Sequence, residues 1–202
     1  NEGLTAIKSE TDYMKQLTER LLFFARSNNG TLIKHFTEID TAQLLQEVYS
    51  EITLIDKEHD IRLTDNDKAV IIAEPGSVKQ MLRIFIDNAI KYTPAGKQIT
   101  LSCRADEKEV IYRIADTGIG IPEKDLNRVF ERFYRVDSSR TKATGGSGLG
   151  LSIAQYIAKA NKAEITLESK VHEGTTVSVI FPLKNGDKNL GSDSEEATRK
   201  LS

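Results

Sequence analysis

The chain has 202 residues, of which 39% are hydrophobic and 29% are charged, and its formal net charge is −2. This length suits one domain of ordinary size with appendages, and the composition is that of a soluble protein with a hydrophobic core. A charge so close to zero provides no basic surface for the phosphates of nucleic acid, which is therefore not an expected partner.

Cysteine content and the lack of a long apolar run bear on the compartment. Cys103 lies in a stretch of alternating apolar and polar residues, so we expect a buried strand residue that cannot form an internal disulfide. No apolar run approaches the ~20 residues that cross a bilayer. Both features fit a cytoplasmic domain. Because the chain starts at Asn1 within a helical pattern, we expect a piece of a longer protein, whose membrane anchor, if it has one, lies upstream.

Residues 1–30 carry apolar side chains at a spacing of about 3.5 residues, which is typical of a helix that packs against another helix. These apolar residues are Leu4, Ile7, Met14, Leu17, Leu21, Leu22 and Phe24. The segment ends at SNNG, where Gly30 suits a helix C-terminus. An ordinary core helix is the alternative, but one long helix before a compact domain better fits half of a helical hairpin.

Helices and strands alternate over residues 31–184. In chain order the sequence predicts strand 33–39, helix 41–52, strands 61–64 and 70–73, helix 75–92, a hairpin of strands 99–105 and 110–115, a short helix within 130–135, helix 148–160, and strands 164–169 and 175–182. Asp40 is a suitable N-cap for the helix that follows it. The mixed order predicts an α+β fold, a two-layer α/β sandwich in which helices cover a mixed sheet, preceded by one long helix. Residues 185–202 are polar and are expected to form a disordered tail.

Asp116 ends a predicted strand and is followed by Thr117, Gly118, Ile119 and Gly120. A carboxylate in this place can accept a hydrogen bond from the exocyclic amine of a base, and glycines lack the Cβ that would keep the backbone from the ring. Asp and Gly are also common turn residues. The segment alone therefore leaves a base-binding loop and a simple turn open.

The segment Gly145–Gly150 reads GGSGLG and opens directly into an apolar helix. The N–H groups and the positive dipole end at a helix N-terminus bind phosphates, and glycines leave room for them. A dinucleotide fingerprint would need glycine where Ile153 stands, and a P-loop would need lysine where Leu151 stands. A flexible linker is the alternative, which the amphipathic helix directly after the glycines disfavours.

Asn88, Lys91 and Tyr92 share one face of the helix predicted at 75–92. The amide oxygen of Asn88 suits Mg²⁺ in the company of phosphates. Lys91 suits phosphate oxygens, and Tyr92 offers an apolar ring face to a base. Taken without the other segments, a solvated polar stripe would be the better explanation of the three residues.

The segment FERFYR, residues 130–135, places aromatic residues at helical spacing, of which Phe130 is expected in the local core. It would anchor a lid rich in Ser, Thr and Gly over about 118–147. Arg135, Arg140 and Lys142 of this lid are candidates to meet the terminal phosphate of a nucleotide, and the sequence does not choose among them.

The four segments occur in the order IDNAIKYTP, DTGIGIP, FERFYR and GGSGLGLSIA, which resembles the N, G1, F and G2 boxes of sensor histidine kinases. The resemblance covers residues 33–183 and implies the Bergerat-type ATP-binding fold, residues 31–184 being the catalytic domain. Residues 1–30 resemble the second helix of that family's dimerisation and phosphoacceptor hairpin. The resemblance implies ATP and Mg²⁺ as cofactors, with Asn88 as the metal ligand and Asp116 on the adenine amino group. The implied nucleotide-binding residues are Asn88, Lys91, Tyr92, Asp116, Gly118, Gly120, Ile121, Gly146, Gly148, Leu149, Gly150 and Thr176, with Thr175 as the alternative to Thr176.

The chain departs from the family pattern in two places. The family's phosphoacceptor histidine has an H-E/D-x-x-x-P context, which none of His35, His59 and His172 has, so surface roles are expected for all three. The acceptor is then upstream or on a partner. The family also usually places a second Asn one helical turn before the metal-binding Asn, where this chain has Ile84.

The resemblance implies an ATP-dependent protein histidine kinase domain of a two-component system. Its expected partners are its own or a partner's phosphoacceptor hairpin and a response regulator, within a homodimer of the full-length protein. Ile84 supports an alternative, a nucleotide-gated interaction module with weak or no phosphotransfer. A scaffold that dimerises and recruits a response regulator is a third hypothesis.

Overall fold

The computed structural model describes Thr11 and residues 35–136 and 147–183. The helix expected over residues 1–30, Thr11 apart, and the tail expected over 185–202 lie outside these residues. In chain order the elements are β1 (Thr37–Asp40), α2 (Thr41–Ile55), β2 (Asp60–Asn66), β3 (Val70–Ala73), α3 (Pro75–Tyr92), β4 (Gln98–Ala105), β5 (Glu109–Asp116), the short 3₁₀ helix η1 (Glu123–Asp125), α4 (Gly150–Ala160), β6 (Glu164–Lys170) and β7 (Gly174–Pro182).

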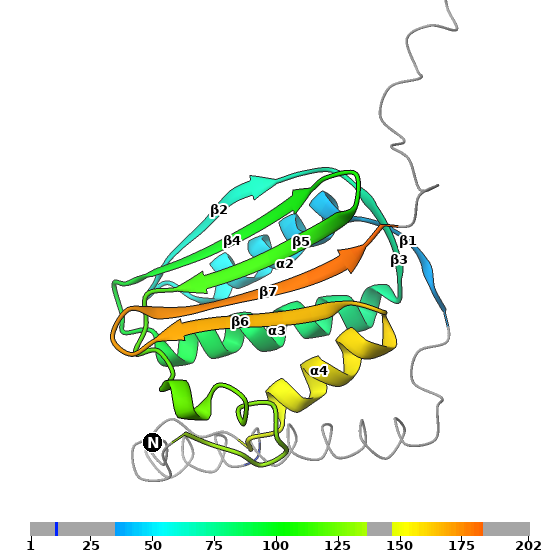
Figure 1. Cartoon of the computed structure of the whole chain (residues 1–202). Coiled ribbons are helices and arrows are strands. Elements are labelled where there is room, and N and C mark those ends of the chain that lie inside the picture. The colour runs from blue at the N-terminus through cyan, green and yellow to red at the C-terminus, as the bar shows by residue number, and fades with distance from the viewer. Residues whose placement is uncertain (1–10, 12–34, 137–146, 184–202) are drawn as a thin grey trace, which may run out of the picture.

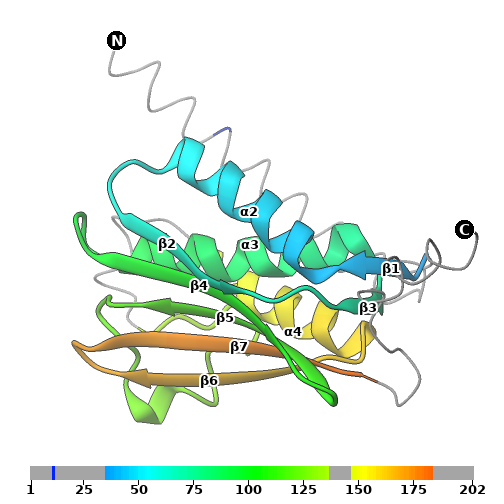
Figure 2. The ribbon, with the colours of Figure 1, turned by 90° about the horizontal axis from the view of Figure 1, so that it is seen from above.

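The elements form two layers. One is a five-stranded mixed sheet with the order β2-β4-β5-β7-β6, in which β2 and β4 run parallel and the other neighbours run antiparallel. Figures 1 and 2 show α2, α3 and α4 together against one face of this sheet. A separate antiparallel pair, β1 with β3, lies at the end of the helical layer. The predicted two-layer α+β sandwich is confirmed.

The core lies between the sheet and the helices. In β5 the residues Val110, Tyr112 and Ile114 alternate with more exposed ones, so one face of the strand is buried. On α3 the buried face consists of Ser77, Val78, Met81, Leu82, Phe85, Ile86 and Ala89. Burial of each large apolar side chain contributes about 1.5–3 kcal/mol, and this fixes the helix against the sheet.

Carboxylates cap the first two helices of the sandwich. As predicted, Asp40 caps α2, with its side chain accepting from the backbone N–H of Gln43. Glu74 caps α3 by accepting from the N–H groups of Gly76 and Ser77. Such caps satisfy N–H groups that have no partner inside the helix.

Asn161 joins the end of α4 to the start of α3. It is buried, and its Oδ1 accepts from the backbone N–H of Glu74 at 2.9 Å. Its Nδ2 donates to the Ser77 hydroxyl at 3.0 Å and to the Ile157 carbonyl at 2.9 Å. The two helices are therefore locked together at this end by a polar group in the core.

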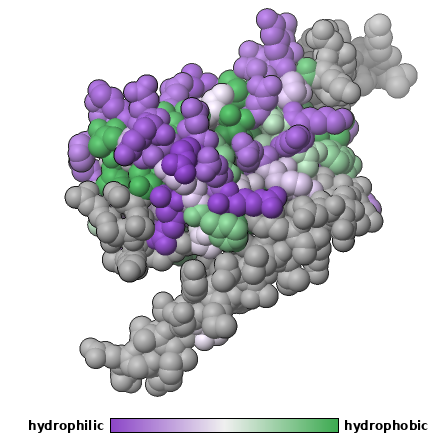
Figure 3. Space-filling view, turned by 60° about the horizontal axis from the view of Figure 1, so that its bottom comes forward, coloured by the Kyte–Doolittle hydropathy of each residue, from purple (hydrophilic) through white to green (hydrophobic). Residues whose placement is uncertain are grey.

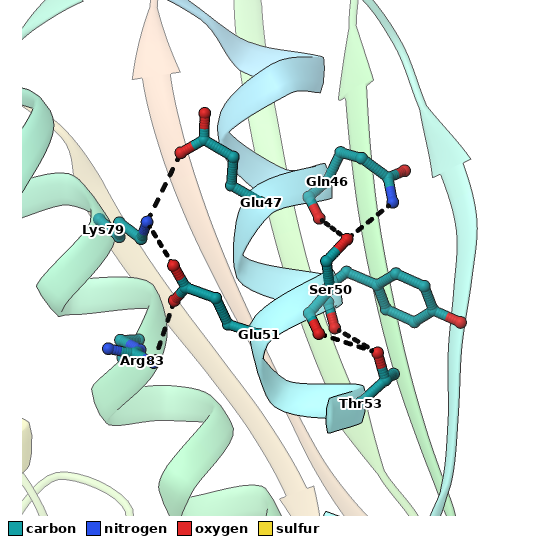
Figure 4. Close-up of polar contacts among 8 residues, drawn as sticks. Gln46, Glu47, Ser50, Glu51, Thr53, Lys79 and Arg83 are labelled. Atoms are coloured by element: carbon teal, nitrogen blue, oxygen red, sulfur yellow. Dashed lines mark hydrogen bonds and ion pairs between the residues drawn. The ribbon is translucent and has the colours of Figure 1, made fainter. Parts of the chain in front are cut away.

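Ion pairs join α2 to α3 at the surface. Figure 4 shows Lys79 between the carboxylates of Glu47 and Glu51, and Arg83 against Glu51. The side chains are partly exposed, so solvent screens these pairs and they contribute little to stability. On the side brought forward in Figure 3, the described surface is mainly hydrophilic, with separate hydrophobic areas.

Two expectations from the sequence are wrong. The helix expected within 130–135 does not form: the segment consists of turns, and Phe133 has a left-handed backbone with φ 64°. The backbone N–H of Phe133 donates to the carbonyl of Gly148, a partner outside the segment, which explains the change. His59, expected at the surface, has a side chain only 5% exposed. His35 and His172 are exposed, and Cys103 is buried in β4, as predicted.

Candidate functional site

Three segments that are distant in the sequence meet at one end of the molecule: the end of α3, the loop after β5, and the start of α4. In Figure 1 they lie at the lower left of the sandwich. The backbone N–H of Ile119 donates to the carbonyl of Tyr92 at 3.1 Å, which joins the loop to α3. A Cβ added to Gly150 would lie 3.4 Å from Cγ2 of Ile84, which joins α4 to α3.

The last turns of α3 carry Asn88, Lys91 and Tyr92. Asn88 lies one turn after Ile84, so it faces the same side of α3 as the start of α4. The ammonium group of Lys91 lies 5.1 Å from the centre of the Tyr92 ring. Burial raises the pKa of Tyr92, while the positive charge of Arg135 acts in the opposite direction. Arg135 therefore lies close enough to Tyr92 to influence it.

Asp116 ends β5 beside the last strand, β7. Its Oδ1 accepts from the N–H groups of Gly118 at 2.8 Å and Thr175 at 3.2 Å. Burial raises the pKa of Asp116 and outweighs these two bonds, which stabilise the ionised form. Both of these hydrogen bonds are to Oδ1, so Oδ2 is the oxygen of this carboxylate that could accept from a ligand.

Gly118 is required by the protein's own backbone. A Cβ there would lie 2.4 Å from the Tyr92 carbonyl oxygen and 2.8 Å from Oδ1 of Asp116. Glycine was expected to admit a ligand, whereas the close approach that the structure describes is between the loop and α3. The loop is held further along by the N–H of His172 on the Ile119 carbonyl and the N–H of Ile121 on the Ser169 hydroxyl.

The start of α4 differs from the starts of α2 and α3. Its N-cap is Leu149, and no side-chain hydrogen bond caps the helix. The side chain of Leu149 is fully buried, so only its backbone is available to a ligand. Gly148 has φ 68° and packs against the backbone of Phe133, which brings FERFYR beside the glycine-rich segment. The uncapped N–H groups of the first turn can bind an anion.

Strand register distinguishes Thr175 from Thr176, between which the sequence did not decide. Thr175 pairs with Asp116, whereas Thr176 pairs with Ala115. Neighbouring residues of a strand point to opposite faces, so Thr176 lies on the face away from Asp116. Thr175 is therefore the threonine beside the carboxylate, and the contact of Thr176 with a nucleotide stays a prediction.

Most of the predicted site residues are brought together, and some fall outside the described part. Gly146, Arg140 and Lys142 lie in 137–146, which the structure does not describe. Ser169 was missed: its hydroxyl accepts from Ile121, donates to the Gly174 carbonyl and lies 2.8 Å from the hydroxyl of Thr175. Only the pairing of β6 with β7 could have revealed it, because no motif includes it.

The family is identified by comparison with known proteins. The family of histidine kinase-, DNA gyrase B- and HSP90-like ATPases matches residues 73–185, more than half of the 202 residues. The chain belongs to this family. Its members are ATP-binding domains, and the matched range contains α3, the Asp116 loop and α4.

Individual relatives agree with the family. The chain is 39% identical over 191 residues to the sensor histidine kinase YkoH of Bacillus subtilis, a match that covers 92% of this chain and 40% of YkoH. It is 38% identical over 184 residues to the signal transduction histidine-protein kinase ArlS of Staphylococcus aureus, covering 89% of this chain and 40% of ArlS. The chain thus spans 40% of the length of these curated relatives.

Solved structures share the fold. Full-length ShkA, determined in complex with AMPPNP, matches with a TM-score of 0.72 and 25% identity, over 93% of this chain and 39% of ShkA. The histidine kinase AdeS of Acinetobacter baumannii matches with a TM-score of 0.72 and 22% identity, over 90% of this chain and 84% of that chain. Within the described ranges, no helix has both the length and the apolarity needed to span a bilayer.

Proposed function

We propose that this chain is the catalytic, ATP-binding part of a two-component histidine kinase, which binds Mg·ATP and transfers the γ-phosphate to a histidine outside residues 1–202. The observation that carries the proposal is the meeting of Asp116, the face of Asn88 and Tyr92, and an uncapped helix start at one end of the sandwich. These groups offer an acceptor for an amine, a polar helix face and anion-binding N–H groups.

Each group has a separate role in holding the nucleotide. Oδ2 of Asp116 accepts from the adenine amino group, which gives preference for adenine over guanine, whose carbonyl in that position cannot donate. The Tyr92 ring flanks the base. Lys91 and the first turn of α4 bind the phosphates, and Arg135 is a described lid residue whose positive charge acts on Tyr92.

Magnesium fits the oxygen donors of this site. The described residues contain no group of three or more His, Cys, Asp or Glu side chains that could hold a metal ion alone. Asn88 supplies a neutral oxygen, and phosphate oxygens supply others, which is how Mg²⁺ is commonly held beside nucleotides. When bound, the ion neutralises charge on the phosphates.

The transfer itself asks for positioning and charge neutralisation. A neutral imidazole nitrogen of the acceptor forms a bond to the γ-phosphorus while the bond from that phosphorus to the bridging oxygen of ADP breaks. ADP leaves with the electron pair, and the imidazole loses its N–H proton to solvent or to a base. The phosphoryl group is then relayed to a response regulator.

The described histidines do not suit the acceptor role. His35 and His172 are exposed but lie outside any helical hairpin, and both ring nitrogens of His59 already have partners. We therefore place the acceptor on a hairpin of which residues 1–30 supply the second helix, either in the same protein or in its partner within a homodimer. The same proposal places this domain in the cytoplasm and places any membrane anchor elsewhere in the parent protein.

Calorimetric titration of ATP, with and without Mg²⁺, tests the proposal on the wild type and on Asp116→Ala. We expect binding that strengthens with Mg²⁺ and is lost in the variant. Added acceptor domain should then become phosphorylated from radiolabelled ATP. Absence of ATP binding in a folded wild-type protein contradicts the proposal.

Ile84 supports a second candidate function, a nucleotide-gated interaction module that transfers poorly. Its side chain packs beside Gly150 on the face that carries Asn88 and offers no polar group there. Replacement of Ile84 with Asn should raise phosphotransfer to an added acceptor domain if this position limits the reaction. An unchanged rate leaves the module without its main support.

A further inference from the structure

The buried side chain of His59 bridges the loop after α2 and the end of α3. Its Nδ1 lies 2.9 Å from Oδ2 of Asp56, and its Nε2 lies 2.9 Å from the carbonyl oxygen of Thr93. Oδ1 of Asp56 also accepts from the backbone N–H groups of Glu58 and His59, each at 3.0 Å. The carboxylate thus shapes the loop and aims the ring at α3.

Both ring nitrogens of His59 face hydrogen-bond acceptors. A carboxylate and a carbonyl cannot donate, so both nitrogens must donate, and only the imidazolium form can do this. Thr93 is the C-cap of α3, where the negative end of the helix dipole favours a positive charge. Burial alone would lower the pKa of His59, but the bonds to Thr93 and Asp56 outweigh it and the pKa is raised.

The segment that His59 holds leads directly into the candidate site. Thr93 follows Tyr92, whose carbonyl accepts from Ile119 of the loop after β5. The same stretch is held by the N–H of Gly96 on the Glu58 carbonyl at 2.7 Å and by the N–H of Asp60 on the Lys97 carbonyl at 3.0 Å. Among these contacts, only the His59 bonds depend on a group that titrates near neutral pH.

We propose that His59 is a positioning residue for nucleotide binding: as an imidazolium between Asp56 and Thr93 it fixes the end of α3, and its loss of a proton loosens Tyr92 and the Asp116 loop. This inference deepens the proposed function and rests on nucleotide binding at that site. ATP affinity therefore depends on pH through a residue that does not touch ATP.

The direction of the pH dependence follows from the charges around the His59 ring. The charged groups that act on it are Asp56 and Glu58 of its own loop, while α3 presents the neutral carbonyl of Thr93. Burial disfavours the ionised Asp56, but hydrogen bonds from His59 and Glu58 outweigh it and lower the pKa of Asp56. The clamp is complete below the ordinary histidine value of 6.5 and above the ordinary aspartate value of 3.8. It is lost as pH rises through the raised pKa of His59, or as pH falls through the lowered pKa of Asp56.

Calorimetry of ATP binding between about pH 6 and pH 9 tests the inference on three proteins. His59→Gln keeps a donor for Thr93 but cannot titrate, and His35→Gln is the control at an exposed histidine. As pH rises across this range, the ATP affinity of the wild type and of His35→Gln should fall by about fivefold more than the ATP affinity of His59→Gln. The nucleotide's own terminal phosphate titrates equally in all three experiments, so the comparison removes its effect. Parallel pH profiles for wild type and His59→Gln overturn the inference.

NMR of the protein without nucleotide separates this inference from the proposed function. The His59 ring should titrate above 6.5, and the amide signals of Gly96 and Ile119 should shift with the same midpoint. If ATP fails to bind at every pH, the proposed function fails, and these shifts still decide whether His59 positions the loop. An ordinary titration of His59, or amides that do not follow it, contradicts the clamp.

Discussion

Replacement of Gly118 with alanine should disrupt the candidate site from within. The new Cβ would lie 2.4 Å from the Tyr92 carbonyl oxygen and 2.8 Å from Oδ1 of Asp116. The first of these atoms belongs to the backbone of α3 and cannot turn away. Since ordinary contact begins at 3.4 Å, the loop would have to move by about 1 Å.

Such a movement breaks two hydrogen bonds at once. They are the Ile119 N–H on the Tyr92 carbonyl and the Gly118 N–H on Asp116. Each is worth about 1 kcal/mol, and overpacking adds about 1–3 kcal/mol, so we expect the free energy of unfolding to fall by about 3–5 kcal/mol. For a domain of this size the Tm falls by about 6–20 °C. The moved carboxylate also loses its alignment, so ATP affinity falls with stability.

Differential scanning fluorimetry and ATP calorimetry measure the two effects side by side. Gly76→Ala is the matched control, because its Cβ would meet only the flexible carboxylate of Glu74, at 3.2 Å, at the start of α3. Alanine favours a helix over glycine by about 1 kcal/mol, so the control should keep or raise the Tm. A Gly118→Ala protein with wild-type Tm and wild-type affinity would refute the claim that the loop has no room.

Three further outcomes follow from buried polar groups. Asn161→Ala removes two hydrogen bonds from the end of α4 to the start of α3 and one within α4, and should lower the urea-derived free energy of unfolding by about 2–4 kcal/mol. A loss below about 0.5 kcal/mol is contrary to a core role. Burial raises the pKa of Cys103 to about 12, so a thiol reagent should react with it only after unfolding. Fast labelling of the native protein would disprove the burial of this thiol. Asp116→Asn keeps an acceptor for the two backbone N–H groups, so the free energy of unfolding should change by less than about 1 kcal/mol. The affinity for ATP should nevertheless fall about tenfold or more. An unchanged affinity would show that Asp116 does not recognise the base.

Sequence reasoning succeeded where the structure depends on local chemistry. The start of α3 follows from Pro75 and its end from Pro94 and Gly96, and the cap of α2 follows from Asp40. The effects of these residues reach only a turn or two. The alternation in β4 and β5 placed Cys103 and Asp116 correctly in strands. The two-layer fold followed from the order of these elements.

Sequence reasoning failed where contacts between distant segments determine the conformation. Phe133 adopts a positive φ because its backbone packs against Gly148, which no helical spacing within FERFYR reveals. The side chain of His59 is buried because it packs against the end of α3, where its Nε2 contacts the carbonyl of Thr93, 34 residues further along the chain. Thr175 rather than Thr176 lies beside Asp116 because of the register of β5 with β7. In each case the missing information is a pairing between segments, which a single sequence does not contain.

The contrast among the helix starts supports an anion at α4. Asp40 and Glu74 cap α2 and α3 with carboxylates, and each supplies both a hydrogen-bond acceptor and a negative charge at the positive end of the dipole. A carboxylate at the start of α4 would occupy the same N–H groups that a phosphate needs and would repel it. Leu149 instead turns its side chain into the core and leaves those groups without a side-chain cap. Asp116 is held by the backbone N–H of Thr175 in β7, so the proposed partners of the adenine amine and of the phosphates both belong to elements of the same sandwich.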